Sequence, residues 1–164
     1  MLELVATRVA AVACHAAPDA ADAAMSTASA YACRIAPDEV LLLGKPGAAA
    51  KLVEAASKKA GAADPDALVL DTTDGWTVWT LEGNDAREAF ARLSAVPLPE
   101  EGFTQGDVAH VPVKVVAFSG RLHLLVPAMW GAFLRERIVE VGLPVHERSE
   151  PVPWAGPDKK RGAS

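Results

Sequence analysis

The sequence ALVLDTTDGWTVWTLEG, residues 67–83, contains the pattern that decides the fold class. Residues 67–72 and 76–81 are rich in branched and aromatic side chains, which favour strands. Between them lies Asp74-Gly75, a dipeptide that is strongly favoured where a tight hairpin needs positive φ. The pattern predicts a β-hairpin. Asn84 after it is a typical N-cap for a helix that must end before Pro97.

The same order of strand, strand and helix occurs on either side of this hairpin. On the N-terminal side, a Pro37-Asp38 turn separates two strands, and an amphipathic helix follows that Gly61 can cap. On the C-terminal side, Ser119-Gly120 joins two alternating strands, and a helix with a continuous apolar stripe comes next. These flanking elements are predicted at residues 28–35, 39–43, 46–60, 110–118, 121–126 and 127–142. Repetition at roughly 40 residues is typical of repeated supersecondary units.

The order of the predicted elements indicates an α+β fold. From residue 39 to residue 118 the order is strand, helix, strand, strand, helix, strand, which is the split βαβ arrangement of ferredoxin-like folds. We therefore predict a ferredoxin-like split βαβ core with an additional C-terminal β-hairpin and helix, in three strand-strand-helix units. One strand is predicted within residues 1–14, a connector at 15–27 and a loop at 97–107.

The length of the chain predicts one domain. A chain of 164 residues can bury one substantial core but has little room for a second. We predict a single α+β domain over residues 1–148. Residues 149–164 are punctuated by proline and are predicted to form an extended or disordered tail.

Composition argues against several classes of protein. The net charge is −5, and no run of Lys and Arg is long enough to follow a phosphate backbone, so nucleic-acid binding is not expected. No segment reaches the length of a membrane span, and Glu3 and Arg8 are out of place in a signal peptide. Cys14 and Cys33 are not closely spaced, which predicts free buried thiols in a cytoplasmic protein.

No arrangement of reactive side chains predicts catalysis. The four histidines lie far apart and lack partners at metal-ligand spacing, so no metal site is expected. Gly44-Lys45-Pro46-Gly47 resembles a phosphate loop only in composition, because Pro46 lacks the N–H that a phosphate cradle uses. We predict no catalytic residue and no cofactor bound by this chain alone.

The tryptophans indicate where a partner could bind. Trp76 and Trp79 have opposite parity on one predicted strand, so both faces of the sheet need an apolar cover. The helices of this domain can provide one cover, and the other is either a partner subunit or this domain itself. For Asp71 and Asp74, turn chemistry is favoured over a carboxylate pair for acid–base catalysis. We assign a partner interface to Trp76, Trp79, Asp71 and Trp130.

Several motifs together resemble the gamma subunit family of sarcosine oxidase. They are RIAPDEVLLLG at 34–44, LDTTDGWTV at 70–78 with the turn at 81–83, residues 103–115 and the final helix containing Trp130. The similarity runs from about residue 28 to residue 142 and rests on the order of these motifs. That family is similar in fold to the aminomethyltransferase of glycine cleavage and to the N-terminal domain of a tRNA-modifying GTPase, which bind folate.

The resemblance implies a non-catalytic gamma-type subunit of a heterotetrameric sarcosine oxidase-like complex. Such a complex oxidatively demethylates sarcosine, passes the one-carbon unit to tetrahydrofolate and reduces oxygen to peroxide. The larger flavoprotein and folate-binding subunits would hold FAD, FMN, NAD and tetrahydrofolate, while this chain serves assembly.

Two departures from the family pattern leave the substrate open. The basic-Gly motif of the family's N-terminal segment is absent, and Pro127-Ala128 replaces an Arg-Ser pair. Another N-methyl amine would fit equally well as the substrate. A stand-alone folate-binding or one-carbon-transfer protein is the alternative function.

Overall fold

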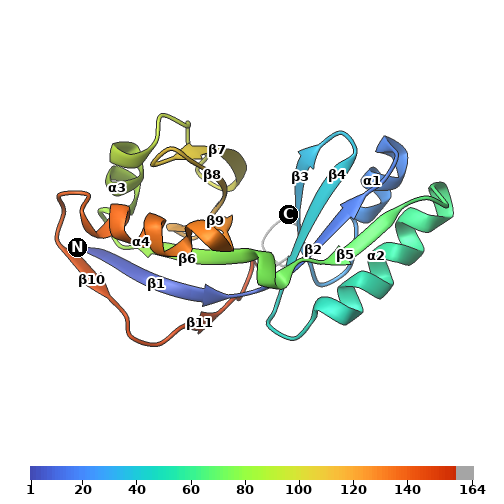
Figure 1. Ribbon diagram of the computed structural model, residues 1–164, viewed down its shortest axis with the longest axis horizontal. Coiled ribbons are helices and arrows are strands. Elements are labelled where there is room, and N and C mark those ends of the chain that lie inside the picture. The colour runs from blue at the N-terminus through green and yellow to red at the C-terminus, as the bar shows by residue number, and fades with distance from the viewer. Residues whose placement is uncertain (158–164) are drawn as a thin grey trace, which may run out of the picture. The chain divides into compact units, whose positions relative to one another are not determined.

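A computed structural model describes residues 1–157 of the chain, and its helices and strands form two compact units (Figure 1). Unit 1 contains residues 1–8 and 74–152, and unit 2 contains residues 9–73 together with the segment that begins at Pro153. Among residues 1–157, no helix is both long and apolar enough to cross a membrane. The mixture of two sheets and four helices confirms the predicted α+β class.

Unit 1 is built on a mainly antiparallel sheet with the strand order β10-β1-β6-β9-β8-β7, and β11 pairs with β1 beside this path. Its strands are β1 (Leu2–Arg8), β6 (Trp76–Glu82), β7 (Gly102–Val108), β8 (Val111–Phe118), β9 (Arg121–Pro127), β10 (Val145–Glu147) and β11 (Val152–Pro153). Its helices are α3 (Ala86–Leu93), the short 3-10 helix η2 (Ala128–Trp130) and α4 (Gly131–Val139). The predicted C-terminal hairpin, β8 to β9 through Ser119-Gly120, is confirmed, and a helix follows it.

The core of unit 1 lies between its sheet and the two helices α3 and α4. Phe90 of α3 and Leu134 of α4 are fully buried against Leu81 of β6 and Leu124 of β9. Burial of side chains of this size stabilises the fold by about 1.5–3 kcal/mol each. Residues at alternate positions on β6 therefore face these helices, and the positions between them face the other side of the sheet.

Unit 2 has a four-stranded antiparallel sheet with the order β3-β4-β2-β5. Its elements are β2 (Ala10–His15), α1 (Pro18–Ala24), β3 (Tyr31–Ala36), β4 (Glu39–Gly44), α2 (Ala49–Ala63) and β5 (Leu68–Asp71). Figure 1 shows α1 and α2 on the same side of this sheet. The order strand, helix, strand, strand, helix, strand is the split βαβ arrangement. It occupies residues 10–71, whereas the sequence placed it at 39–118.

Small side chains form the helical layer of unit 2. Ala20, Ala21 and Ala24 of α1 are fully buried, as are Ala56 and Ala60 of α2. Alanine has the highest helix propensity and lets two helices approach closely, since it has no bulk beyond Cβ. The prediction that the connector at 15–27 has too few large apolar groups to specify packing is wrong for this reason: the segment contains a helix that packs through alanines.

The predicted hairpin across Asp74-Gly75 is wrong. β5 pairs with β2 in unit 2, whereas β6 pairs with β1 and β9 in unit 1. Residues 73–75 form a single 3-10 turn, the element η1 (Thr73–Gly75), and Gly75 does not adopt the positive φ that a tight hairpin turn needs. The chain thus leaves one sheet and enters the other at this turn.

Other boundaries also differ from the predictions. Residues 1–14 contain two strands, β1 and β2, in different sheets, where one strand was expected. The predicted loop at 97–107 contains most of β7, which pairs with β8 along its whole length. Gly61 lies inside α2, and Asp64 caps the end of that helix instead. Asn84 precedes α3, but Asp85 occupies the N-cap position.

The C-terminal segment is extended and carries one buried side chain. Val152–Pro153 pairs as β11, and Trp154 is only 3% exposed. The Trp154 ring packs edge-to-face against Tyr31, with the ring centres 6.3 Å apart. The part of the predicted tail at 158–164 lies outside the described residues. A single domain over residues 1–148 stays a prediction, because two contact units in one chain can still unfold together.

Candidate functional site

Trp79 lies on the helix-facing side of β6. Its indole Nε1–H donates a hydrogen bond to the carbonyl oxygen of Gly131 at 2.9 Å, and its ring packs against the core cluster of unit 1. Gly131, the first residue of α4, has no room for a side chain, because a Cβ there would lie 2.6 Å from Oγ1 of Thr77. Trp79 therefore fixes the start of α4 and is partly an internal structural residue.

Trp76 lies on the opposite side of β6, as its parity predicts, and is half-buried. Trp130 is 40% exposed in η2, and Met129 beside it is 80% exposed. The Trp130 ring stacks edge-to-face on Phe133 with centres 6.0 Å apart. We call Met129, Trp130 and Phe133 the η2 patch. Exposed apolar side chains that cluster into a patch are typical of interaction surfaces.

Asp71 belongs to unit 2, whereas the three tryptophans of the predicted interface belong to unit 1. Its carboxylate accepts a hydrogen bond from the backbone N–H of Thr73 at 3.0 Å. Hydrogen bonds from the side chain and backbone of Thr73 hold the pKa of Asp71 below its ordinary value. This geometry is the turn chemistry that the sequence favoured for Asp71.

Three buried polar side chains on the neighbouring strands β1, β6 and β9 are linked in the unit 1 sheet. Thr7 and Thr80 share a hydrogen bond of 2.6 Å between their hydroxyl oxygens, and Oγ1 of Thr80 lies 2.8 Å from Nδ1 of His123. The imidazole stacks on Phe118 with ring centres 4.8 Å apart. Burial, helped by the positive charge of Arg121, lowers the pKa of His123 to about 4. His123 is therefore neutral at neutral pH and serves the sheet as a structural group.

Other reactive groups lie buried and apart. Cys14 and Cys33 are buried in the unit 2 sheet, and burial raises the pKa of the Cys14 thiol above its ordinary value. A raised pKa makes a thiol a poor nucleophile. Within residues 1–157, no group of three or more His, Cys, Asp and Glu side chains could hold a metal ion.

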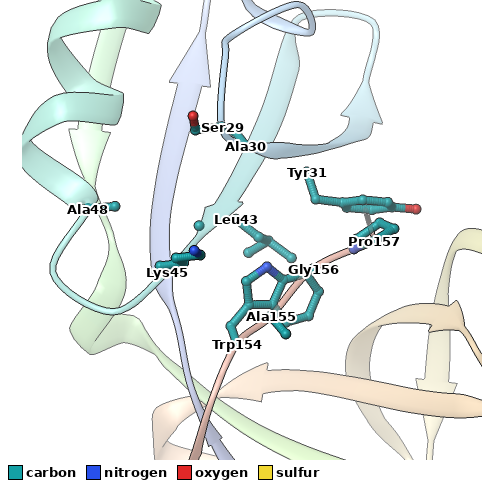
Figure 2. Close-up of a pocket in the computed structure, with 11 residues that line it drawn as sticks. Ser29, Ala30, Tyr31, Leu43, Lys45, Ala48, Trp154, Ala155, Gly156 and Pro157 are labelled. Carbon is teal, nitrogen blue, oxygen red and sulfur yellow. The ribbon is translucent and has the colours of Figure 1, made fainter. Parts of the chain in front are cut away.

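Unit 2 contains a cavity of about 540 Å³ that the sequence did not predict. It lies beside the first residues of β3 and the last residues of β4, and the segment after β11 closes one side (Figure 2). The lining residues are Ser29, Ala30, Tyr31, Leu43, Gly44, Lys45, Ala48, Trp154, Ala155, Gly156 and Pro157. They come from four separate stretches of sequence, so no local motif could reveal the cavity. The one available signal was Trp154, an isolated large aromatic residue in a polar tail.

Known proteins resemble this chain in structure but not in sequence. No family model matches it, and a search of curated proteins finds no match. A chain of the heterotetrameric sarcosine oxidase from Corynebacterium sp. U-96, solved in complex with pyrrole 2-carboxylate, is similar with a TM-score of 0.71 and 16% identity. The similarity covers 87% of this chain and 86% of that one.

A second solved structure is similar over part of its length. The glycine cleavage system aminomethyltransferase T from Bartonella henselae matches with a TM-score of 0.64 and 14% identity, over 93% of this chain. This chain spans 48% of that enzyme's length. Identities this low show a common fold and nothing further. The resemblance read from the motifs is confirmed at that level: this chain has the fold shared by a chain of heterotetrameric sarcosine oxidase and by half of aminomethyltransferase T.

Proposed function

We propose that this chain is a non-catalytic, gamma-type subunit of a heterotetrameric sarcosine oxidase-like complex in the cytoplasm. The observation that carries the proposal is the reciprocal match in size: 87% of this chain covers 86% of the sarcosine oxidase chain. Aminomethyltransferase T is about twice as long as the matched part, since the match covers 48% of it. The match to most of one oxidase subunit supports the subunit role more strongly than the match to about half of aminomethyltransferase T supports an independent transferase.

The chemistry of the buried groups supports a non-catalytic role. The Cys14 thiol has a raised pKa, and the His123 imidazole is neutral inside the sheet with its pKa lowered to about 4. Neither group is poised as a nucleophile or base near neutral pH. In the proposed complex, FAD, FMN, NAD and tetrahydrofolate are bound by the larger subunits. The complex would demethylate an N-methyl amine and transfer the one-carbon unit to tetrahydrofolate.

The η2 patch is the proposed contact with a larger flavoprotein or folate-binding subunit. Met129 and Trp130 together present apolar surface at the start of α4, and Trp79 fixes that helix start through its hydrogen bond to Gly131. A preorganised aromatic anchor of this kind is typical of binding hot spots. Trp76, on the other face of β6, is proposed as a second contact. Asp71 lies in the other unit and is proposed only as a separate contact.

Capture from the native host tests the proposal. The tagged chain is purified under mild conditions, the captured chains are identified by mass spectrometry, and the absorbance spectrum is recorded for bound flavin. We expect a flavoprotein to be captured in a fixed ratio. Capture without any flavoprotein would refute the subunit role, and tight tetrahydrofolate binding by the isolated chain would support the stand-alone alternative instead.

Two variants then locate the contact. Met129→Asp combined with Trp130→Asp places charges on the η2 patch, while Glu136→Ala changes an exposed side chain of α4, the helix that follows η2, as a control. Loss of a hot spot costs about 2 kcal/mol or more, roughly a thirtyfold loss in affinity. Equal affinity of both variants for the flavoprotein would exclude the η2 patch while leaving the subunit role intact.

A further inference from the structure

We propose that the cavity of unit 2 binds a small organic anion with a flat apolar body, its acidic group next to Lys45 and its body against Tyr31 and Trp154. This inference goes beyond the proposed subunit role and does not depend on it. The volume of about 540 Å³ lies in the range of small-molecule sites, which is about 300–1,000 Å³.

Small residues line part of the cavity. Ala30, Gly44 and Ala48 line the space, and none has bulk beyond Cβ. The walls around them are held by the core: Leu43 is fully buried, Ala30 is 8% exposed and Trp154 is 3% exposed. A cavity with such fixed walls is largely preformed, which reduces the entropy lost when a ligand binds.

Two aromatic rings meet at an angle in the wall. The planes of Tyr31 and Trp154 are inclined by 65°, with centres 6.3 Å apart. Figure 2 shows Leu43 and Trp154 between Lys45 on one side and Tyr31 with Pro157 on the other. Aromatic faces and edges favour a flat ligand that stacks on one ring and meets the edge of the other. The apolar body of the ligand therefore belongs at the Tyr31 and Trp154 end.

The charge of the lining favours an anion. Among the described lining residues Lys45 is the one that carries a charge, although the whole chain carries a net charge of −5. Within residues 1–157, no carboxylate lies within ion-pair distance of its ammonium group. Ala48, at the same end, precedes α2, whose first turn has no acidic side chain. The positive end of that helix dipole adds to the potential set by Lys45.

The segment after β11 completes the site. Gly156 has a φ of 66°, and a Cβ there would lie 3.0 Å from Nε1 of Trp154. Glycine thus lets the backbone pass close to the indole and turn along the cavity. The lining is formed jointly by the β3 and β4 ends and by this segment, so the site needs the C-terminal residues to be present.

A pair of fluorescent probes tests the proposal on the full chain. Anilinonaphthalene sulfonate is a flat apolar anion, and N-phenylnaphthylamine is its uncharged parent. The chain has four tryptophans, so a heteronuclear NMR spectrum shows few indole N–H signals, and Trp154→Phe assigns one of them. We expect the sulfonate probe to bind in a one-to-one ratio and to shift the Trp154 signal.

Charge variants decide the orientation. Lys45→Gln should lower the affinity for the sulfonate probe by on the order of fivefold to tenfold, which is the effect of losing one ion pair. The affinity for the uncharged probe should stay the same. Lys45→Arg should restore binding. Lys51→Gln, a change of an exposed lysine on α2 outside the lining, is the matched control and should change neither probe.

The outcomes against the proposal are equally definite. If neither probe shifts the Trp154 signal, the cavity is not a binding site. If Lys45→Gln lowers the affinity for both probes alike, the site does not select anions. The same conclusion follows if Lys51→Gln lowers the affinity for the sulfonate probe as much as Lys45→Gln does. The Lys45 and Lys51 variants change exposed side chains and need no assigned spectrum, so the charge test stands even if Trp154→Phe fails to fold. Neither result bears on capture of a flavoprotein, which tests the subunit role separately.

Discussion

Protonation of His123 should destabilise the protein on mild acidification. The pKa of its imidazole is lowered from 6.5 to about 4 in the folded chain, mainly by burial and also by Arg121. A folded pKa below the unfolded one means that stability is fully present above 6.5 and is lost as the pH falls from 6.5 toward about 4. The loss is about 1.4 kcal/mol per pH unit in this window, or roughly 3 kcal/mol in total.

Urea denaturation at several pH values measures this effect. Between about pH 7 and about pH 5, we expect the free energy of unfolding to fall by about 2 kcal/mol. The carboxylates with lowered pKa, Asp64, Asp71 and Glu147, act in the same direction but at lower pH, because their unfolded pKa values are about 4. The comparison above about pH 5 therefore isolates the histidine.

The control is His123→Gln, which stays neutral at every pH and can keep a hydrogen bond to Thr80. Its stability should be lower than that of the parent at neutral pH but should change much less between about pH 7 and about pH 5. Titration of the His123 ring protons by NMR provides a second measurement that needs no variant. A parent protein with a flat stability profile, or an imidazole that titrates near 6.5, would refute the account of His123 as a buried neutral group.

Three further predictions concern packing. Trp79→Ala should cost about 3 kcal/mol in urea denaturation, because it removes core contacts and the hydrogen bond to α4; a loss below about 1 kcal/mol would contradict its internal role. Thr80→Val keeps the shape but takes a partner from Thr7 and His123, which should cost about 1–3 kcal/mol by the same assay; a neutral result would exclude a stabilising polar chain. Trp154→Ala should lower the melting temperature by several degrees, since the ring is 3% exposed; an unchanged melting temperature would show that the segment does not stabilise unit 2.

Local signals in the sequence predicted most elements but not their partners. The Pro37-Asp38 and Ser119-Gly120 turns join strands that pair with each other, as predicted. Asp74-Gly75 has equally good turn chemistry, yet its flanking strands belong to two sheets. A favourable local turn is outweighed because each flanking strand forms several hydrogen bonds and side-chain contacts with its own partner strands. Pairing with β1, 73 residues away at the Thr7 to Thr80 contact, was not visible locally.

Strand β7 and helix α1 were missed because small residues occupy their close-packed positions. A Cβ at Gly106 in β7 would lie 2.4 Å from Cγ2 of Val96, so glycine is required by a close contact although it is a poor strand residue. In α1 the buried positions are alanines, which give no hydrophobic stripe. The cavity was missed for a third reason, because Lys45 and Trp154 meet only through tertiary structure.

The two crossings between the sheets have a consequence for how the chain folds. Residues 9–73, which make up most of unit 2, are an insertion in unit 1 between Arg8 and Asp74, and the rest of unit 2 begins at Pro153. The two ends of the insertion are tied together inside unit 2: the N–H of Thr72 donates to the carbonyl oxygen of Ala11 at 2.8 Å, and Oγ1 of Thr73 accepts from the N–H of Ala11 at 3.1 Å.

Once unit 2 has folded, β1 and β6 are joined by an effectively short linker, and their antiparallel pairing resembles that of a local hairpin. Shortening a loop of this length to a few residues removes roughly 2 kcal/mol of closure entropy. Folding of the insertion therefore brings β1 and β6 close together. Unit 2 should refold before these two strands pair in the unit 1 sheet. For the same reason, replacing residues 9–73 by a short turn should leave a unit 1 sheet in which β1 still pairs with β6.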